Sequence, residues 1–135
     1  MGPCYNTVLQ SHQKWFVGND ARAIMLADED LVAQVGQNIY PLVAAEGTTG
    51  DFLVYYRQHY SKQDSKMGVH EDDCTLAVVA VSDSYDNAIA LASKIDNALT
   101  GKHQFSGYTL TFRLEDSTEV FEDNKYIETL LFNIK

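Results

Sequence analysis

The segment 70–74 holds the residue types best suited to chemistry. It reads His70-Glu71-Asp72-Asp73-Cys74. Carboxylates there could ligate a hard divalent cation, and the thiolate a softer one. The 4 histidines of the chain are scattered, and none has a second histidine at the i+2 or i+4 spacing of common metal sites. The alternative functional hypothesis is therefore a small metal- or ligand-binding enzyme that uses His70, Glu71 and Asp73, while the simpler interpretation is a solvated acidic loop.

Sequence signatures of nucleophilic and phosphate chemistry are missing. There is no GxSxG elbow, and the glycine pair of Gly47-Thr48-Thr49-Gly50 lacks a following Lys-Ser/Thr and precedes a strand-like run. The remaining acidic pairs adjoin expected caps and turns, where carboxylates are common. The sequence therefore predicts no catalytic residue, no cofactor and no metal, and a protein that is not an enzyme.

Basic and protonatable residues gather in a polar stretch between two strand-like runs. The interface candidates from this stretch are Arg57, His59, Lys62, Lys66, Met67 and His70. One interpretation is a solvated loop; the other is a docking surface for an acidic patch, including a patch on a neighbouring copy of the chain. The acidic run Asp28, Glu29 and Asp30 is the candidate counterpart.

Composition limits the class of protein. The 135 residues, 45% of them hydrophobic, suit one domain with a core. The net charge of -9 opposes general binding to nucleic acid, and no apolar run reaches the length of a membrane span. The 2 cysteines, Cys4 and Cys74, are expected to be free thiols of a soluble cytosolic protein.

Hydrophobic periodicity predicts an α+β fold in the order helix, two strands, helix, two strands. The expected helices, strands and turn regions are a helical segment 21–35, strands 52–59 and 74–81 around a long loop 61–73, a helix capped at 82–84 and ended by Gly101, and strands 108–114 and 126–134 around a turn 115–124. We expect a mainly antiparallel sheet of about four to five strands packed against two helices. Residues 1–19 are read as an N-terminal extension and 20–135 as a single domain.

Several short stretches resemble one known family. These are Ala27–Pro41, which ends in Val-Gly-Gln-Asn-Ile-Tyr-Pro, then Phe52–Tyr55, Val78–Leu99, Glu119–Asp123 and Tyr126–Ile134. Together they are similar to phage tail-completion, or tail-terminator-like, proteins across residues 20–135. The resemblance lies in structural signatures and not in catalytic residues.

That resemblance implies a tail-terminator-like fold and a structural role in virion assembly. It implies a hexameric ring at the head-proximal end of a phage tail, with contacts to the tail-tube protein and the head-tail connector. The expected location is the virion tail, and the host bacterial cytoplasm during assembly. No membrane and no specific nucleic acid are expected as partners.

Overall fold

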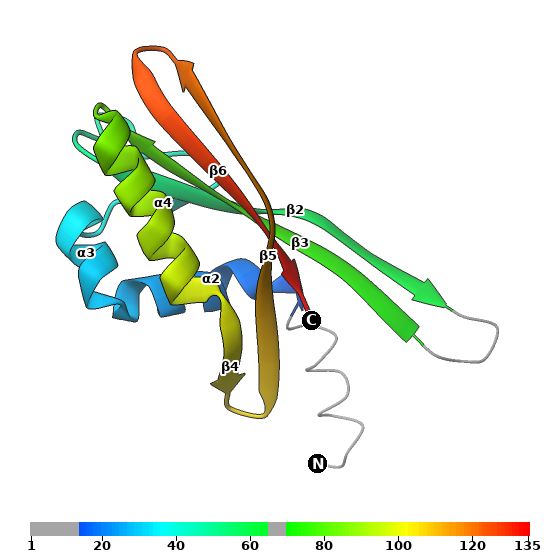
Figure 1. Cartoon of the computed structure of the whole chain (residues 1–135). Coiled ribbons are helices and arrows are strands. Elements are labelled where there is room, and N and C mark those ends of the chain that lie inside the picture. Colours follow the sequence, from blue (N-terminus) through cyan, green and yellow to red (C-terminus); the bar gives the residue numbers. More distant parts are fainter. Residues whose placement is uncertain (1–13, 65–69) are drawn as a thin grey trace.

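The structure is a computed structural model that describes residues 14–64 and 70–135, with only the backbone described at 62–64 and 70–72. The described elements are the helices α2 (Val17–Ala27), α3 (Glu29–Val35) and α4 (Tyr85–Leu99), and the strands β1 (Ile39–Pro41), β2 (Phe52–Asp64), β3 (His70–Ser82), β4 (Gly101–Phe105), β5 (Tyr108–Glu122) and β6 (Lys125–Ile134). Figure 1 shows the helices beside a strongly curled sheet.

The six described strands form one sheet in the order β1-β2-β3-β6-β5-β4. Only β1 and β2 pair in parallel; the other neighbours are antiparallel. The predicted α+β class is thus confirmed, but the prediction of four to five strands and two helices was wrong in number and order. It missed the short edge strands β1 and β4, whose few residues leave little periodic signal, and it merged α2 and α3.

The helices pack together on one face of the sheet, where α4 contacts β3 and β6. In α4 the hydrophobic periodicity that predicted the helix corresponds to one buried face, formed by Ala88, Leu91, Ile95 and Leu99. The alternation of the last strands also holds: Leu110, Phe112, Leu130, Phe132 and Ile134 all join the core. Ser84 caps α4 and Gly101, at φ +120°, follows its end, as predicted.

The N-terminal helical region bends at Asp28. The Asp28 carboxylate accepts a hydrogen bond of 3.0 Å from the Leu31 amide and thereby starts α3. Helix α2 begins at Val17, which is fully buried and lies within the segment assigned above to an N-terminal extension. A Cβ at Gly18 would lie 3.2 Å from the Tyr55 ring, so glycine permits close packing of α2 on β2.

Two long β-ribbons extend from the sheet (Figure 1). Strands β2 and β3 pair as far as Asp64 and His70, so the predicted loop 61–73 was wrong for most of its length. Strand β5 runs to Glu122, so the predicted turn 115–124 was wrong as well. The actual turn is Asp123-Asn124, with φ of 52° and 62°, a two-residue hairpin loop that Asp and Asn tolerate.

Each ribbon contains a register shift near its base. In β2 the shift lies between Arg57 and His59, and in β5 between Leu114 and Asp116. Because strand side chains alternate, one extra residue moves all following side chains to the opposite face. On β5 the helix-facing set therefore changes from Leu110, Phe112 and Leu114 to Ser117, Glu119 and Phe121, which pair with Leu130, Glu128 and Tyr126.

Candidate functional site

The predicted interface residues are distributed over different parts of the fold. Asp28, Glu29 and Asp30 form the cap and first turn of α3, where carboxylates favour the positive end of the helix dipole. Arg57 and His59 lie on β2, with the register shift between them. In Figure 1, α3 and the far end of the β2–β3 ribbon lie at opposite ends of the molecule.

The register shift at Gln58 places Arg57 and His59 on different faces of the ribbon. Arg57 donates a hydrogen bond of 3.0 Å to the Trp15 carbonyl, and its guanidinium lies 4.4 Å from the centre of the Trp15 ring. His59 instead lies 3.2 Å from the Ser61 hydroxyl and 3.5 Å from the Asp73 carboxylate. The two side chains therefore do not form one basic surface.

The other basic candidates are only partly described. Lys62 and His70 lie in strands, opposite Asp72 and Asp64 in backbone register. Their side chains, and the residues Lys66 and Met67, lie outside the described part of the chain.

For the metal hypothesis, the described part of the cluster is limited to Asp73 and the buried Cys74. The side chains of His70 and Glu71 and the whole of Cys4 fall outside the described residues. Within those that are described, no group of three or more His, Cys, Asp or Glu side chains is arranged to hold a metal ion. None of the described helices combines the length and apolar character that crossing a bilayer requires.

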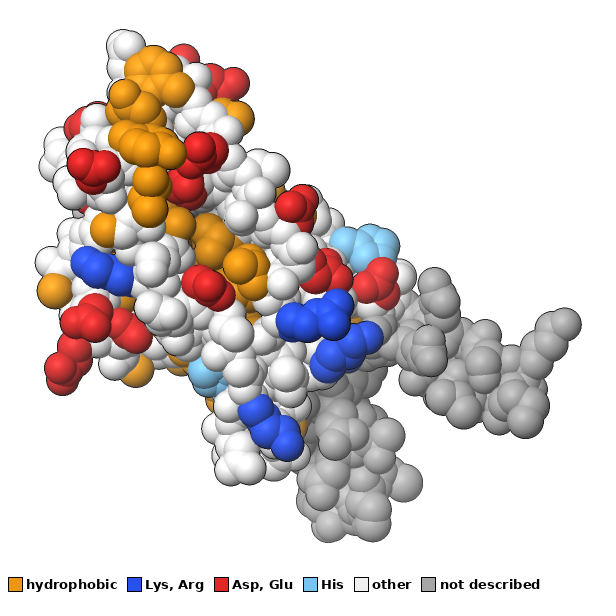
Figure 2. Space-filling model, viewed as in Figure 1, with side chains coloured by type: hydrophobic (Ala, Val, Ile, Leu, Met, Phe, Trp, Pro, Cys, Tyr) orange, Lys and Arg blue, Asp and Glu red, His pale blue; other side chains and the backbone are white. Residues whose placement is uncertain are grey.

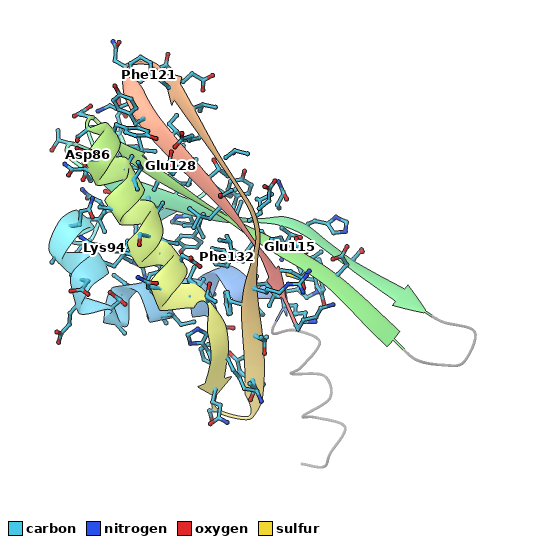
Figure 3. All side chains as sticks on the ribbon, in the orientation of Figure 1. Asp86, Lys94, Glu115, Phe121, Glu128 and Phe132 are labelled. Carbon is cyan, nitrogen blue, oxygen red and sulfur yellow. The ribbon has the colours of Figure 1, made fainter. Side chains whose placement is uncertain are left out.

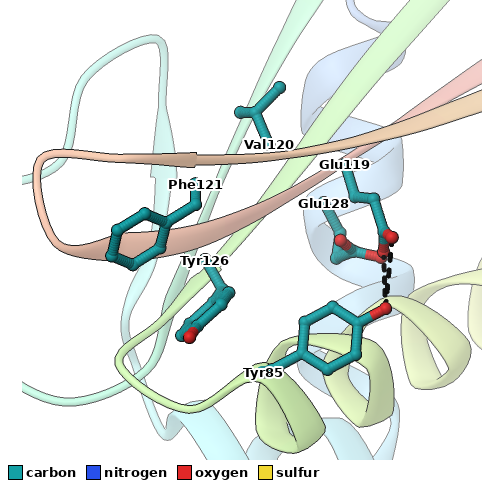
Figure 4. A pocket seen from close by; sticks show the side chains of 6 residues that line it. All are labelled: Tyr85, Glu119, Val120, Phe121, Tyr126 and Glu128. Carbon is teal, nitrogen blue, oxygen red and sulfur yellow. Dashed lines mark hydrogen bonds between the residues drawn. The ribbon is translucent and has the colours of Figure 1, made fainter.

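The free end of the β5–β6 ribbon forms a different candidate site with the start of α4. A shallow hollow of about 200 Å³, here called the tip pocket, is lined by Tyr85, Glu119, Val120, Phe121, Tyr126 and Glu128. Tyr85 comes from α4, and the other residues come from the two strands of the ribbon (Figure 4). No lining residue among those described is a Lys, Arg or His.

Aromatic rings make up much of the tip pocket. Tyr126 contacts Tyr85 at 5.5 Å and Phe121 at 4.8 Å between ring centres. Phe121 and Tyr85 nevertheless remain 58% and 43% exposed, which is unusual for large side chains in contact. In Figure 2 hydrophobic side chains continue from this tip along the molecule, with acidic side chains beside them. Exposed apolar patches of this kind mark interaction surfaces.

Two contacts fix the ribbon against the start of α4. The Tyr85 hydroxyl donates to the Glu119 carboxylate, 3.1 Å from Oε1 and 3.2 Å from Oε2 (Figure 4). Next to the ribbon turn, Lys125 forms an ion pair with Asp83 in the loop before α4. That loop is held by Ser82, whose hydroxyl donates to Asp51 at 2.7 Å and accepts from the Ser84 amide at 3.1 Å. Side-chain contacts therefore hold both the ribbon and the loop before α4 in place around the pocket.

The two carboxylates of the tip pocket face each other across the ribbon. Glu119 and Glu128 are direct partners in the antiparallel register, where like charges repel. Burial first, and then the hydrogen bond and charge of Glu119, raise the pKa of Glu128 to about 7. The hydrogen bond to Glu119 raises the pKa of Tyr85, so Tyr85 stays a donor at neutral pH. The pair thus retains a proton in a large share of molecules near pH 7.

Figure 3 shows Glu128 on the side of β6 that faces α4, with Asp86 on the first turn of α4, on the other side of the helix. The pocket lining contains no Ser, Thr, Cys or Lys nucleophile, no His to act as its base and no cation to stabilise developing negative charge. Two carboxylates beside exposed aromatic faces are instead suited to binding a cation.

The tip pocket was not predicted, because residues 115–124 were expected to form a turn. A signal was present: Asp123-Asn124 is a favourable two-residue hairpin turn, and residues at equal distances from it face each other. That rule pairs Glu119 with Glu128 and Phe121 with Tyr126, as the register shows. The contribution of Tyr85 could not be found in this way, because it depends on tertiary packing.

Comparison with known proteins finds similarity at the level of the fold. No family model matches the chain, and no curated protein matches it. Among solved structures, a chain of the virion of a native gene transfer agent particle aligns with a TM-score of 0.70 at 17% identity, over 84% of this chain and 89% of that one. A second solved chain, whose name states no function, aligns with a TM-score of 0.57 at 13% identity, over 87% and 94% of the two chains. At these identities the likeness shows a shared fold.

Proposed function

We propose that this chain is a structural protein of a phage-like virion, and within that class a tail-completion protein at the head-proximal end of the tail. The observation that carries the proposal is the alignment with a chain of a gene transfer agent virion over most of both chains. The short signatures that resemble tail-completion proteins, such as Ile39-Tyr40-Pro41, support the narrower role.

The shape of the molecule is consistent with a role in assembly. Both ribbons reach beyond the helix-covered part of the sheet and present long stretches of strand surface (Figure 1). Exposed large hydrophobic side chains occur at separate places, including Phe121 on one ribbon and Leu42 and Val43 in the loop after β1. A subunit with several such surfaces can contact more than one neighbour.

In this role the chain would close a tail by forming a ring of identical subunits, six by the family resemblance, and would contact the tail-tube protein and the head-tail connector. Ring contacts are heterologous, because each subunit presents one surface to the preceding copy and another to the next. The protein would act in the host bacterial cytoplasm during assembly and remain in the virion tail. No catalytic step is required of it.

The test combines the purified chain with the tail-tube protein of a phage-like particle. Native mass spectrometry and negative-stain microscopy should show closed rings, alone or on the ends of tail tubes. The major capsid protein of the same particle is the control and should not be bound. A chain that stays monomeric and binds neither tail tube nor connector would refute the tail role. Capping of tubes without a ring of six would refute only the stoichiometry.

A further inference from the structure

The tip pocket has negative charge and aromatic surface but no cation of its own. Its lining includes Glu119 and Glu128 and three aromatic rings. The nearby Lys125 is engaged with Asp83, and Asp86 adds a further negative charge at the start of α4. On the face shown in Figure 2, Lys and Arg side chains lie away from this tip. No cation among the described residues therefore balances the negative charge of the two pocket carboxylates.

The dimensions of the pocket suit a single side chain. A hollow of about 200 Å³ between a hairpin and one helix end is too small for a docked helix or strand. The rings of Phe121, Tyr126 and Tyr85 form a row, and the two carboxylates lie at the Tyr85 end of it (Figure 4). A planar guanidinium can stack on such rings while donating paired hydrogen bonds to carboxylates, which an ammonium group cannot do.

We propose that the tip pocket binds one arginine side chain presented by a different protein. The net charge of -9 disfavours docking of a second copy through an acidic pocket. Two described basic residues of the chain are also already engaged, Arg57 with Trp15 and Lys94 with Gln34. The proposal rests on the pocket and does not depend on the proposed role in a tail.

Arginine binding is coupled to a proton. The described groups that line the pocket beside Glu128 are Glu119 from β5 and Tyr85 from α4, and Asp86 acts on Tyr85 from the start of α4, so no described cation shares the site. A guanidinium placed between the two carboxylates favours the doubly ionised pair and displaces the retained proton. Since the pKa of Glu128 is about 7, affinity should rise between pH 6 and pH 8, by up to about tenfold for one proton.

The test uses the whole chain, labelled with ¹⁵N, and the pentapeptide acetyl-Ser-Gly-Arg-Gly-Ser-amide. The matched control peptide contains citrulline, which has nearly the same shape but no charge. We expect the arginine peptide to bind at least about fivefold more tightly and to shift the amide signals of Tyr85, Phe121 and Tyr126. Raising the pH from 6 to 8 should tighten only the arginine peptide.

Variants separate the pocket from general charge effects. Glu119→Gln and Glu128→Gln should each weaken binding several-fold, while Glu115→Gln, the same change on the same ribbon outside the pocket, should not. Well-dispersed amide spectra would confirm that each variant is folded. Equal binding of the arginine and citrulline peptides to the wild type would overturn the proposal. A loss of binding in Glu115→Gln as large as in the two pocket variants would overturn it as well.

Two further outcomes address the occupant. A lysine peptide that binds as tightly as the arginine peptide would overturn the assignment to a guanidinium. Self-association in sedimentation experiments that is abolished by Glu128→Gln would show that a second copy fills the pocket, and would overturn the assignment to a different protein. The proposal is supported by arginine-selective binding together with one of two results: the chain is monomeric, or its self-association is unchanged by Glu128→Gln.

Discussion

Replacing Tyr108 by Phe tests how the β4–β5 hairpin is anchored to α2. The Tyr108 hydroxyl donates a hydrogen bond of 2.8 Å to Asp20 Oδ1, while Asp20 Oδ2 is buried with no hydrogen-bond partner among the described residues. Hydrogen bonds to charged groups contribute about 1.5–3 kcal/mol, and solvent screening lowers this for a half-buried carboxylate. We therefore expect Tyr108→Phe to lower the free energy of unfolding by about 1–2 kcal/mol at pH 7.

The loss should depend on pH in a defined direction. Burial raises the pKa of Asp20, and the Tyr108 hydrogen bond partly opposes that rise. Without the hydroxyl the native pKa rises further, so the native state holds the proton more tightly than the unfolded state does. Ionisation then costs more stability as the pH increases above the ordinary value of 3.8. The difference between Tyr108→Phe and the wild type should therefore be larger at pH 7 than at pH 3.

Urea denaturation followed by circular dichroism measures both effects. Tyr56→Phe is the control, because the Tyr56 hydroxyl has no hydrogen-bond partner within the described part of the chain. In a double-mutant cycle with Asp20→Ala, which removes the acceptor, the coupling at pH 7 should be close to the loss caused by Tyr108→Phe alone. A loss equal to that of Tyr56→Phe, or one that does not change with pH, would refute the reasoning.

Three further predictions concern the pocket, the core and a helix cap. Glu128 binds its proton more tightly in the native state, so the free energy of unfolding of the wild type should fall as the pH rises from 4.5 to about 7. Glu128→Gln should remove this fall, which urea midpoints measure. Parallel pH profiles of the variant and the wild type would contradict the prediction. Changing the buried Phe112 to Ala should lower the free energy of unfolding by about 3–5 kcal/mol, whereas the same change at the exposed Phe121 should lower it by less than about 0.5 kcal/mol. Thermal melts that are similar for the two variants would refute this. Asp28→Ala should cost about 1 kcal/mol by losing the cap on Leu31, whereas Asp28→Asn should retain most of it.

The sequence predicted the regular parts of this fold well. Helix α4 and the first half of β5 follow a single period over their whole length, and each buries one continuous face. The outer part of the β5–β6 ribbon was not predicted, because residues 115–122 are exposed and the apolar side chains of Val120 and Phe121 follow one another instead of alternating with polar ones. The register shifts add to the difficulty: Phe112 and Phe121 face the same side although their spacing along the chain is odd, which in a regular strand would place them on opposite faces.

For the sites, the sequence showed which residues are charged but not which of them meet. The predicted group around Arg57 and His59 is divided by a register shift, which no pattern of residue types reveals. Glu119 and Glu128 could have been paired from the turn between them. Tyr85 could not, because its place beside Glu119 depends on how α4 packs against β3 and β6.

The extra residue in β5 determines which of two sets of side chains in the outer ribbon faces α4. Beyond Leu114, the set Ser117, Glu119 and Phe121 now faces α4, and the set Thr118, Val120 and Glu122 faces away. Deletion of Glu115 would exchange the two sets while leaving the core strand before it in place. A single codon lost or gained at this point could therefore change what the tip binds in one evolutionary step, without any substitution at the tip and without rebuilding the domain. Related chains that differ in length at this position would be expected to differ in partner.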